Sequence, residues 1–280
     1  MKRVHGFTLI EMIVAMVITG IIAAMVSVFM VAPIKGYQDT VRRAGLSDAA
    51  DTALKRMALE IRTALPNSVR VSGNQYIEFI PTTGGGRYRA DFGTGGTGDP
   101  LNFDFSGDCT GVACSFDVLG PNVTIASGDH LVIFNTGQTG LNAYGATTGN
   151  NRRPITTAAG SVSAITFSGA AFPYESPSQR FHVVSSTLGP VTFGCDGGKL
   201  RRYTGYATGS VDWNPAPADQ PDPPTSGSSA LLADGATCYF DYDPAVSAEN
   251  GLVTLRITLT DGPSGESVTL HQQLHVDNSP

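Results

Sequence analysis

The chain has 280 residues, of which 15% are charged, and its formal net charge is −6. This length suits one medium-sized domain with a long additional element, and the acidic balance argues against a nucleic-acid partner. The 33 glycines and 17 prolines favour turns and short strands over helices in much of the chain.

The first predicted element is a helix that spans a membrane. A basic leader, residues 1–6, precedes an apolar segment, residues 7–32, in which Glu11 is the one charged side chain. The segment exceeds the roughly 20 residues needed to cross the hydrocarbon layer, and its apolar side chains outweigh the cost of one carboxylate. Lys2 and Arg3 predict that the leader stays cytoplasmic. We therefore expect a single-pass inner-membrane protein with its C-terminus in the periplasm.

The sequence Gly6-Phe7-Thr8-Leu9-Ile10-Glu11, together with the basic leader and the apolar run, resembles the N-terminus of type IV prepilins and type II secretion pseudopilins. The resemblance covers about the first thirty residues. It implies that a prepilin peptidase/methyltransferase cuts between Gly6 and Phe7 and N-methylates Phe7. It also implies assembly with major and other minor pilins on an inner-membrane platform, and a place in a pilus on the cell surface afterwards.

Glu11 is the candidate assembly residue. A carboxylate at membrane depth requires a partner, and cleavage would place the new amino group of Phe7 at a similar depth. A Glu11–amine pair between subunits would satisfy both charges and set the axial register. The family that this N-terminus resembles uses its glutamate in this way. The alternative is that Glu11 reaches the cytoplasmic interface instead.

Residues 33–66 are predicted to continue the helix in amphipathic form, ending before Pro66. Gly20 and Pro33 are either ordinary helix features or points where the helix bends in a filament. We expect an apolar stripe on this part to dock on the domain that follows. The stripe consists of Ile34, Tyr37, Val41, Ala44, Ala50, Leu54, Met57, Ile61 and Leu65.

Residues 67–280 are predicted to form a periplasmic, β-rich domain. Alternating or short apolar runs between turn residues predict strands at 76–80, 129–135, 163–167, 180–184, 190–193, 199–203, 252–260 and 267–276. Turn residues at 196–198 and 261–265 predict two hairpins. Loops are expected at 81–99, 137–154 and 212–229. The whole chain is thus predicted to be α+β and pilin-like, with a long helix packed on an antiparallel sheet.

Four cysteines are predicted to form two disulfides, Cys109–Cys114 and Cys195–Cys238, although three pairings are possible from sequence. The expected export of this domain favours disulfides over zinc-bound thiolates. A zinc site would also need closely spaced pairs of ligands, and the four cysteines contain only one such pair.

The other motifs in the sequence do not indicate a catalytic, nucleotide-binding or metal site. Residues 93–98 match G-x-G-x-x-G, but Asp99-Pro100 follows where a helix should begin, so we expect a flexible loop. Asp241, Asp243, Glu249 and Asn250 offer oxygen ligands for calcium, which the resemblance allows, but a solvated turn is the favoured interpretation. The five histidines, His5, His130, His182, His271 and His275, lack metal-site spacing. We expect no enzyme activity, no cofactor and no metal.

Two further segments, residues 59–71 and 274–280, look like minor prepilins of mannose-sensitive haemagglutinin (MSHA) pili. This resemblance implies low-copy incorporation, in a priming or tip complex with other minor pilins. A minor pseudopilin of a type II secretion system shares every feature of the N-terminus. A third hypothesis is a membrane-anchored periplasmic adhesin or enzyme whose N-terminus is only an anchor.

Overall fold

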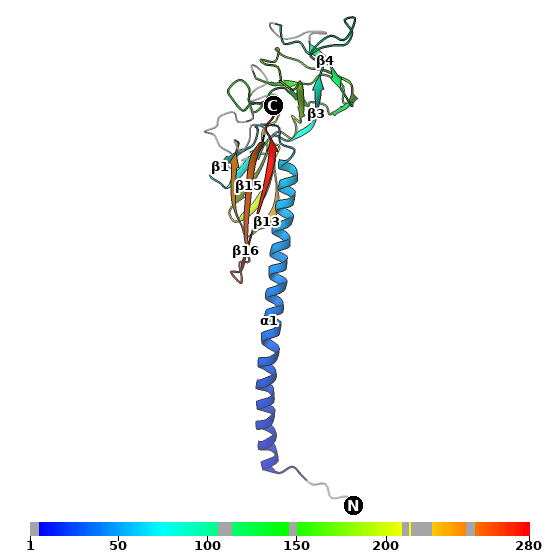
Figure 1. The fold of residues 1–280 in the computed structure, drawn as a ribbon. Coiled ribbons are helices and arrows are strands. Elements are labelled where there is room, and N and C mark those ends of the chain that lie inside the picture. The colour runs from blue at the N-terminus through cyan, green and yellow to red at the C-terminus, as the bar shows by residue number, and fades with distance from the viewer. Residues whose placement is uncertain (1–5, 106–113, 146–149, 209–212, 214–225, 245–249) are drawn as a thin grey trace, which may run out of the picture.

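The long helix α1 (Leu9–Ile61) extends far beyond the β-rich body of the molecule, so that its N-terminal half stands alone (Figure 1). The computed structural model describes residues 6–105, 114–145, 150–208, 213, 226–244 and 250–280. Within these ranges one helix is followed by antiparallel strands, which confirms the predicted α+β class.

The strands of the described residues fall into four sheets, and their bounds follow. The first half contains β1 (Arg70–Ser72), β2 (Tyr76–Phe79), β3 (Thr82–Tyr88), β4 (Ser115–Leu119), β5 (Val123–Ile125), β6 (His130–Val132), β7 (Arg152–Pro154) and β8 (Gly160–Val162). The second half contains β9 (Ala164–Thr166), β10 (Arg180–Val184), β11 (Val191–Asp196), β12 (Lys199–Thr204), β13 (Ser228–Asp234), β14 (Ala236–Asp243), β15 (Asn250–Thr260) and β16 (Ser267–Asp277).

The ends of α1 are set by its flanking residues. Thr8 is the N-cap, with extended backbone angles, and Pro33 lies inside the helix. At the other end the helix stops at Ile61, four residues before the predicted end at Leu65. The chain turns there, because the Leu65 N–H donates to the carbonyl oxygen of Ile80 at 2.7 Å and Ala64 bridges to Pro81.

The first lobe consists of two sheets and the last part of α1, from Ala50 to Ile61, which packs mainly against β15 and β16. One sheet has the order β1-β2-β11-β12-β13 and the other β14-β15-β16. Their shared core contains helix residues such as Leu54 and Met57 and the inward-facing residues of β15. The predicted hairpins, β11–β12 and β15–β16, are both present. A disulfide between Cys195 on β11 and Cys238 on β14 joins the two sheets.

The distal lobe, residues 82–184, is an insertion between two neighbouring strands of the first lobe. Phe79 on β2 pairs directly with Val191 on β11, so the chain leaves and returns at adjacent points. The insertion forms a six-stranded sheet, β7-β6-β10-β3-β4-β9, and a two-stranded sheet, β5-β8. It lies at the end of the molecule away from the free half of α1 (Figure 1).

The prediction of a loop at 81–99 was wrong for its first part, which forms β3 inside the six-stranded sheet. Glycines are depleted in strands, but here they allow a close approach of β10. A Cβ atom on Gly85 would lie 2.9 Å from the carbonyl oxygen of Phe181, and one on Gly86 would lie 3.1 Å from the Phe181 ring. Sequence analysis also missed β1, β4, β5, β7, β8, β13 and β14.

Buried charges lie where the two lobes meet. Glu78 is 2% exposed and accepts hydrogen bonds from Arg70 Nε at 2.7 Å and from the Tyr206 hydroxyl at 2.8 Å. Trp213 is fully buried, and the Arg152 guanidinium lies 3.6 Å from the centre of its ring. The Glu78 contacts lie within the first lobe, whereas Arg152 belongs to the distal lobe and Trp213 does not, so the contact between these two side chains joins the lobes.

Two histidines are expected to make the stability of the fold pH-dependent. Desolvation, with Arg152 beside it, lowers the pKa of His130 to about 4, and desolvation lowers the pKa of His182 to about 4 as well. Between pH 6.5 and 4 the unfolded chain therefore binds protons that the folded chain does not. We expect unfolding free energy to fall with pH across this window, by about 3 kcal/mol for each histidine.

Thermal unfolding of the full chain in detergent, followed by near-ultraviolet circular dichroism, measures this dependence. His130→Asn is expected to flatten the decline, and His271→Asn, at an exposed position on β16, serves as the control. A melting temperature of the unsubstituted chain that is unchanged from pH 6.5 to 4 contradicts the prediction.

Candidate functional site

The N-terminal turn of α1 holds Glu11 in a defined position. The Glu11 carboxylate oxygen Oε2 accepts hydrogen bonds from the backbone N–H and the hydroxyl of Thr8, both at 2.9 Å. In return the Glu11 N–H donates to Thr8 Oγ1 at 3.4 Å, which completes a capping box. Both bonds to the carboxylate fall on Oε2, so within the described part of the chain Oε1 carries no hydrogen bond.

The capping box occupies an otherwise uncovered apolar surface. Every residue from Gly6 to Val31 is exposed, and Phe7 is 84% exposed. In the described part of the chain, α1 contains the one segment long and apolar enough to cross a membrane. Because an apolar surface of this extent is not stable in water, it requires lipid or other helices around it.

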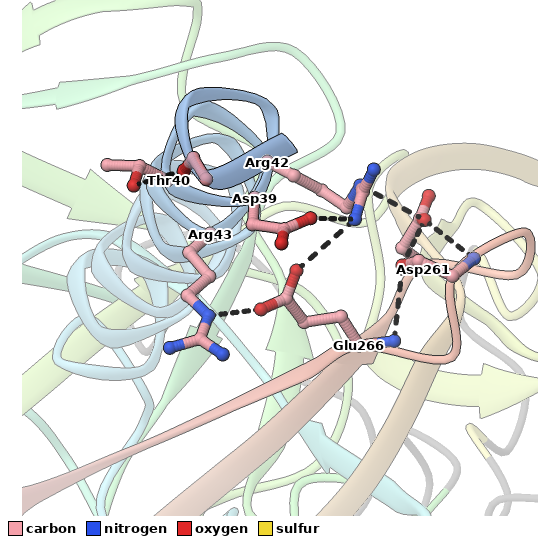
Figure 2. Close-up of polar contacts among 8 residues, drawn as sticks. Asp39, Thr40, Arg42, Arg43, Asp261 and Glu266 are labelled. Carbon is pink, nitrogen blue, oxygen red and sulfur yellow. Dashed lines mark hydrogen bonds and ion pairs between the residues drawn. The ribbon is translucent and has the colours of Figure 1, made fainter. Parts of the chain in front are cut away.

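The tip of the β15–β16 hairpin, residues 261–266, holds α1 where the helix meets the body (Figure 2). Arg43 on α1 bonds to Glu266, and Arg42 lies 3.5 Å from both Glu266 and Asp261. Arg42 also contacts Asp39 on the same helix at 3.1 Å. These ion pairs fix the hairpin tip on one side of the helix.

A second ionic contact fixes the end of α1. Arg202 on β12 donates from Nε to Glu60 Oε2 at 2.6 Å. Ionic contacts therefore join the body to α1 on both sides of the buried stretch, at Arg43 and at Glu60.

The predicted docking stripe proves to be two faces rather than one. Ala50, Leu54 and Met57 are buried against the body, as expected. Ile34, Tyr37 and Val41 are 55%, 72% and 52% exposed, so the expectation that they dock was wrong. The nine positions from Val41 to Ala50 correspond to about two and a half helical turns, so the two groups point to opposite sides.

The structure tests one of the two predicted disulfides and does not describe residues 1–5 of the leader. Cys195 and Cys238 form the expected disulfide, whereas Cys109 lies outside the described residues, so its pairing with Cys114 stays a prediction. The leader residues Lys2 and Arg3 also lie outside them.

Asp241 and Asp243 are exposed, as expected, but they belong to β14 rather than to a turn, and Glu249 lies outside the described residues. In residues 93–98 the Gly93 N–H donates to the Thr97 carbonyl at 2.7 Å, which closes a short turn. Among the described residues no three His, Cys, Asp or Glu side chains gather as a metal site would require.

Comparison with known protein families gives a match at the N-terminus of the chain. Residues 1–27 match the family model of the prokaryotic N-terminal methylation motif, which covers Gly6, Phe7 and Glu11. The match supports a type IV prepilin-like precursor, which is processed by a prepilin peptidase and assembles with other pilins into a pilus or pseudopilus. Motif and apolar helix together indicate a single-pass membrane anchor. No curated protein and no solved structure matches the chain.

Proposed function

We propose that this chain is a minor pilin of an MSHA-type type IV pilus, cut after Gly6 and assembled into the pilus, or priming its assembly, through α1. The observation that carries the proposal is the position of Glu11 on a fully exposed apolar helix inside the methylation motif. Such a helix is stored in the inner membrane and then transferred into a bundle of similar helices. The chain acts as a structural subunit rather than as an enzyme.

The assignment to MSHA pili is supported by the two segments that look like the minor prepilin MshO, residues 59–71 and 274–280. In the fold these segments touch. The Asn67 side-chain amide donates to the backbone carbonyl of Asn278 at 3.0 Å, and the Asn67 N–H donates to Asn278 Oδ1 at 3.3 Å. The two segments therefore lie in contact near the end of α1.

The runner-up function is that of a minor pseudopilin in a type II secretion system, because the N-terminus serves both machines equally. The two differ in where the mature chain is found and in what its deletion impairs. A pilin is recovered with sheared surface filaments, and its loss reduces piliation. A pseudopilin stays with the cell envelope, and its loss reduces protein secretion.

N-terminal mass spectrometry of chain recovered separately from sheared filaments and from membranes tests the proposal. We expect the filament fraction to begin at N-methyl-Phe7, at low abundance relative to the major pilin. A mature chain that begins at Met1, or beyond residue 20, contradicts processing by a prepilin peptidase. A correctly processed chain that is absent from filaments favours the pseudopilin.

A further inference from the structure

The distal lobe contains a pocket that the proposed function does not use. Its volume is about 590 Å³, within the range of small-molecule sites, and the lobe lies at the end of the molecule away from the free half of α1 (Figure 1). The apolar lining includes Leu101, which is buried, and the rings of Phe92 and Phe103. Phe103 is held against Tyr88, with ring centres 5.9 Å apart, whereas the Phe92 side chain is 67% exposed. The Phe92 ring is therefore available to a ligand.

One wall of the pocket, residues 99–101, is fixed by the neighbouring backbone. The Asp99 carbonyl accepts a hydrogen bond from the Asp117 N–H at 2.8 Å, and the Asp99 N–H donates to Asp117 Oδ2 at 3.0 Å. The Leu101 N–H donates to the carbonyl oxygen of Arg89 at 2.8 Å. Because this wall is already ordered, a ligand that enters the pocket does not have to be offset by the cost of ordering it.

The charged side chains that line the pocket are all acidic. Asp99, Asp104 and Glu175 belong to the lining, and among the described residues no lysine, arginine or histidine does. The nearby Arg89 already contacts Asp117, with its Nε 3.1 Å from the carboxylate oxygen Oδ2. In the part of the chain that the structure describes, neither Asp104 nor Glu175 forms an ion pair. Negative charge at a concave, partly apolar surface attracts a positively charged ligand.

The three carboxylates suit an organic cation better than a metal ion. Within the described ranges no three His, Cys, Asp or Glu side chains lie close enough together to hold a metal, so these acids do not converge on one point. Each can instead pair with a separate positive group. The faces of phenylalanine rings also attract cations, and the apolar lining favours hydrocarbon between the charges.

We propose that this pocket binds a small organic polycation, in which ammonium groups are separated by methylene chains, as they are in spermidine. The ammonium groups pair with Asp99, Asp104 and Glu175, and the methylene chain packs on Leu101 and Phe92. The proposal goes beyond the proposed function and does not depend on it, because a pilin and a pseudopilin would carry the same pocket.

Isothermal titration calorimetry of the full chain in a non-ionic detergent tests the pocket, with spermidine as the probe. At about 0.1 M salt, which screens exposed charges more than roughly 10 Å apart, we expect saturable binding of one spermidine per chain. Asp104→Asn combined with Glu175→Gln is expected to weaken binding about tenfold, because it removes two exposed ion pairs with the ligand. Phe92→Ala, which removes the exposed ring, is expected to weaken binding about threefold.

A control of equal charge separates the pocket from the acidic surface as a whole. Asp196→Asn combined with Asp241→Asn removes two exposed carboxylates from β11 and β14 in the first lobe, and it is expected to leave the affinity for spermidine unchanged. Calcium chloride, titrated in place of spermidine, is expected to show no saturable binding. The proposal is overturned if spermidine does not bind saturably, if both double variants lose affinity equally, or if calcium binds and competes with spermidine.

Discussion

Glu11→Leu is expected to insert into the membrane and be cleaved normally, yet to disappear from filaments. Leucine favours insertion more than glutamate does, so the membrane-stored form should accumulate to at least its usual amount. What is lost is the negative charge that pairs with the amino group of Phe7 on a neighbouring subunit. In the structure Thr8 occupies Oε2 of the carboxylate and leaves Oε1 for such a partner. Quantitative immunoblotting of membranes and sheared filaments measures both populations.

Glu11→Gln distinguishes the charge from the capping box. Glutamine at this position preserves the reciprocal hydrogen bonds with Thr8, because the capping box accepts Glu or Gln. Loss of the cap alone costs about 1 kcal/mol, too little to abolish assembly. If the charge carries the function, Glu11→Gln is lost from filaments to the same extent as Glu11→Leu. Normal assembly of Glu11→Gln would show that capping, rather than charge pairing, is the role of this residue.

Gly6→Leu is expected to abolish processing, so that all of the chain remains in the membrane as uncut precursor. A Cβ atom built on Gly6 meets nothing within 4 Å, so the fold itself does not require glycine at this position. A steric requirement must therefore come from the peptidase that binds the chain. Intact mass measurement of membrane-extracted protein gives the result directly.

Gly20→Leu is the matched control, because Gly20 is equally open but lies inside α1, away from the cleavage site. It is expected to be cut like the unsubstituted chain. Efficient cleavage of Gly6→Leu between residues 6 and 7 would contradict recognition of this motif by a prepilin peptidase.

The N-terminal half of α1 could be predicted from sequence, because one short motif and one long apolar run determine it. The strands of the β15–β16 hairpin were also predictable, since side chains alternate clearly on either side of the turn at 261–265. The distal lobe was not predictable as an insertion. Pairing of Phe79 with Val191 joins positions that are remote in sequence, and no local pattern records such a partner.

Two errors have specific physical causes. Gly84, Gly85 and Gly86 resemble a loop by composition, but the strand needs them because β10 approaches Gly85 and Gly86, and β5 approaches Gly84, too closely for side chains. The prediction of a single docking stripe was wrong because spacings of three and four residues keep only neighbouring positions on one side of a helix, and their angular offsets accumulate. Across the interval from Val41 to Ala50 the apolar face changes sides, and the cumulative angle along the helix would have revealed it.

The place where the distal lobe joins the first lobe has an evolutionary consequence. Because Phe79 and Val191 are hydrogen-bonding neighbours, the chain enters and leaves residues 82–184 at one point of the first lobe, although the two lobes also share a buried cluster that contains Leu65, Val132 and Trp213. Changes in the part of the distal lobe that lies away from this cluster leave the pairing of β2 with β11 and the ion pairs of the hairpin tip unaltered. Natural selection can therefore diversify what the molecule presents at its far end while the membrane-borne shaft stays compatible with its partners.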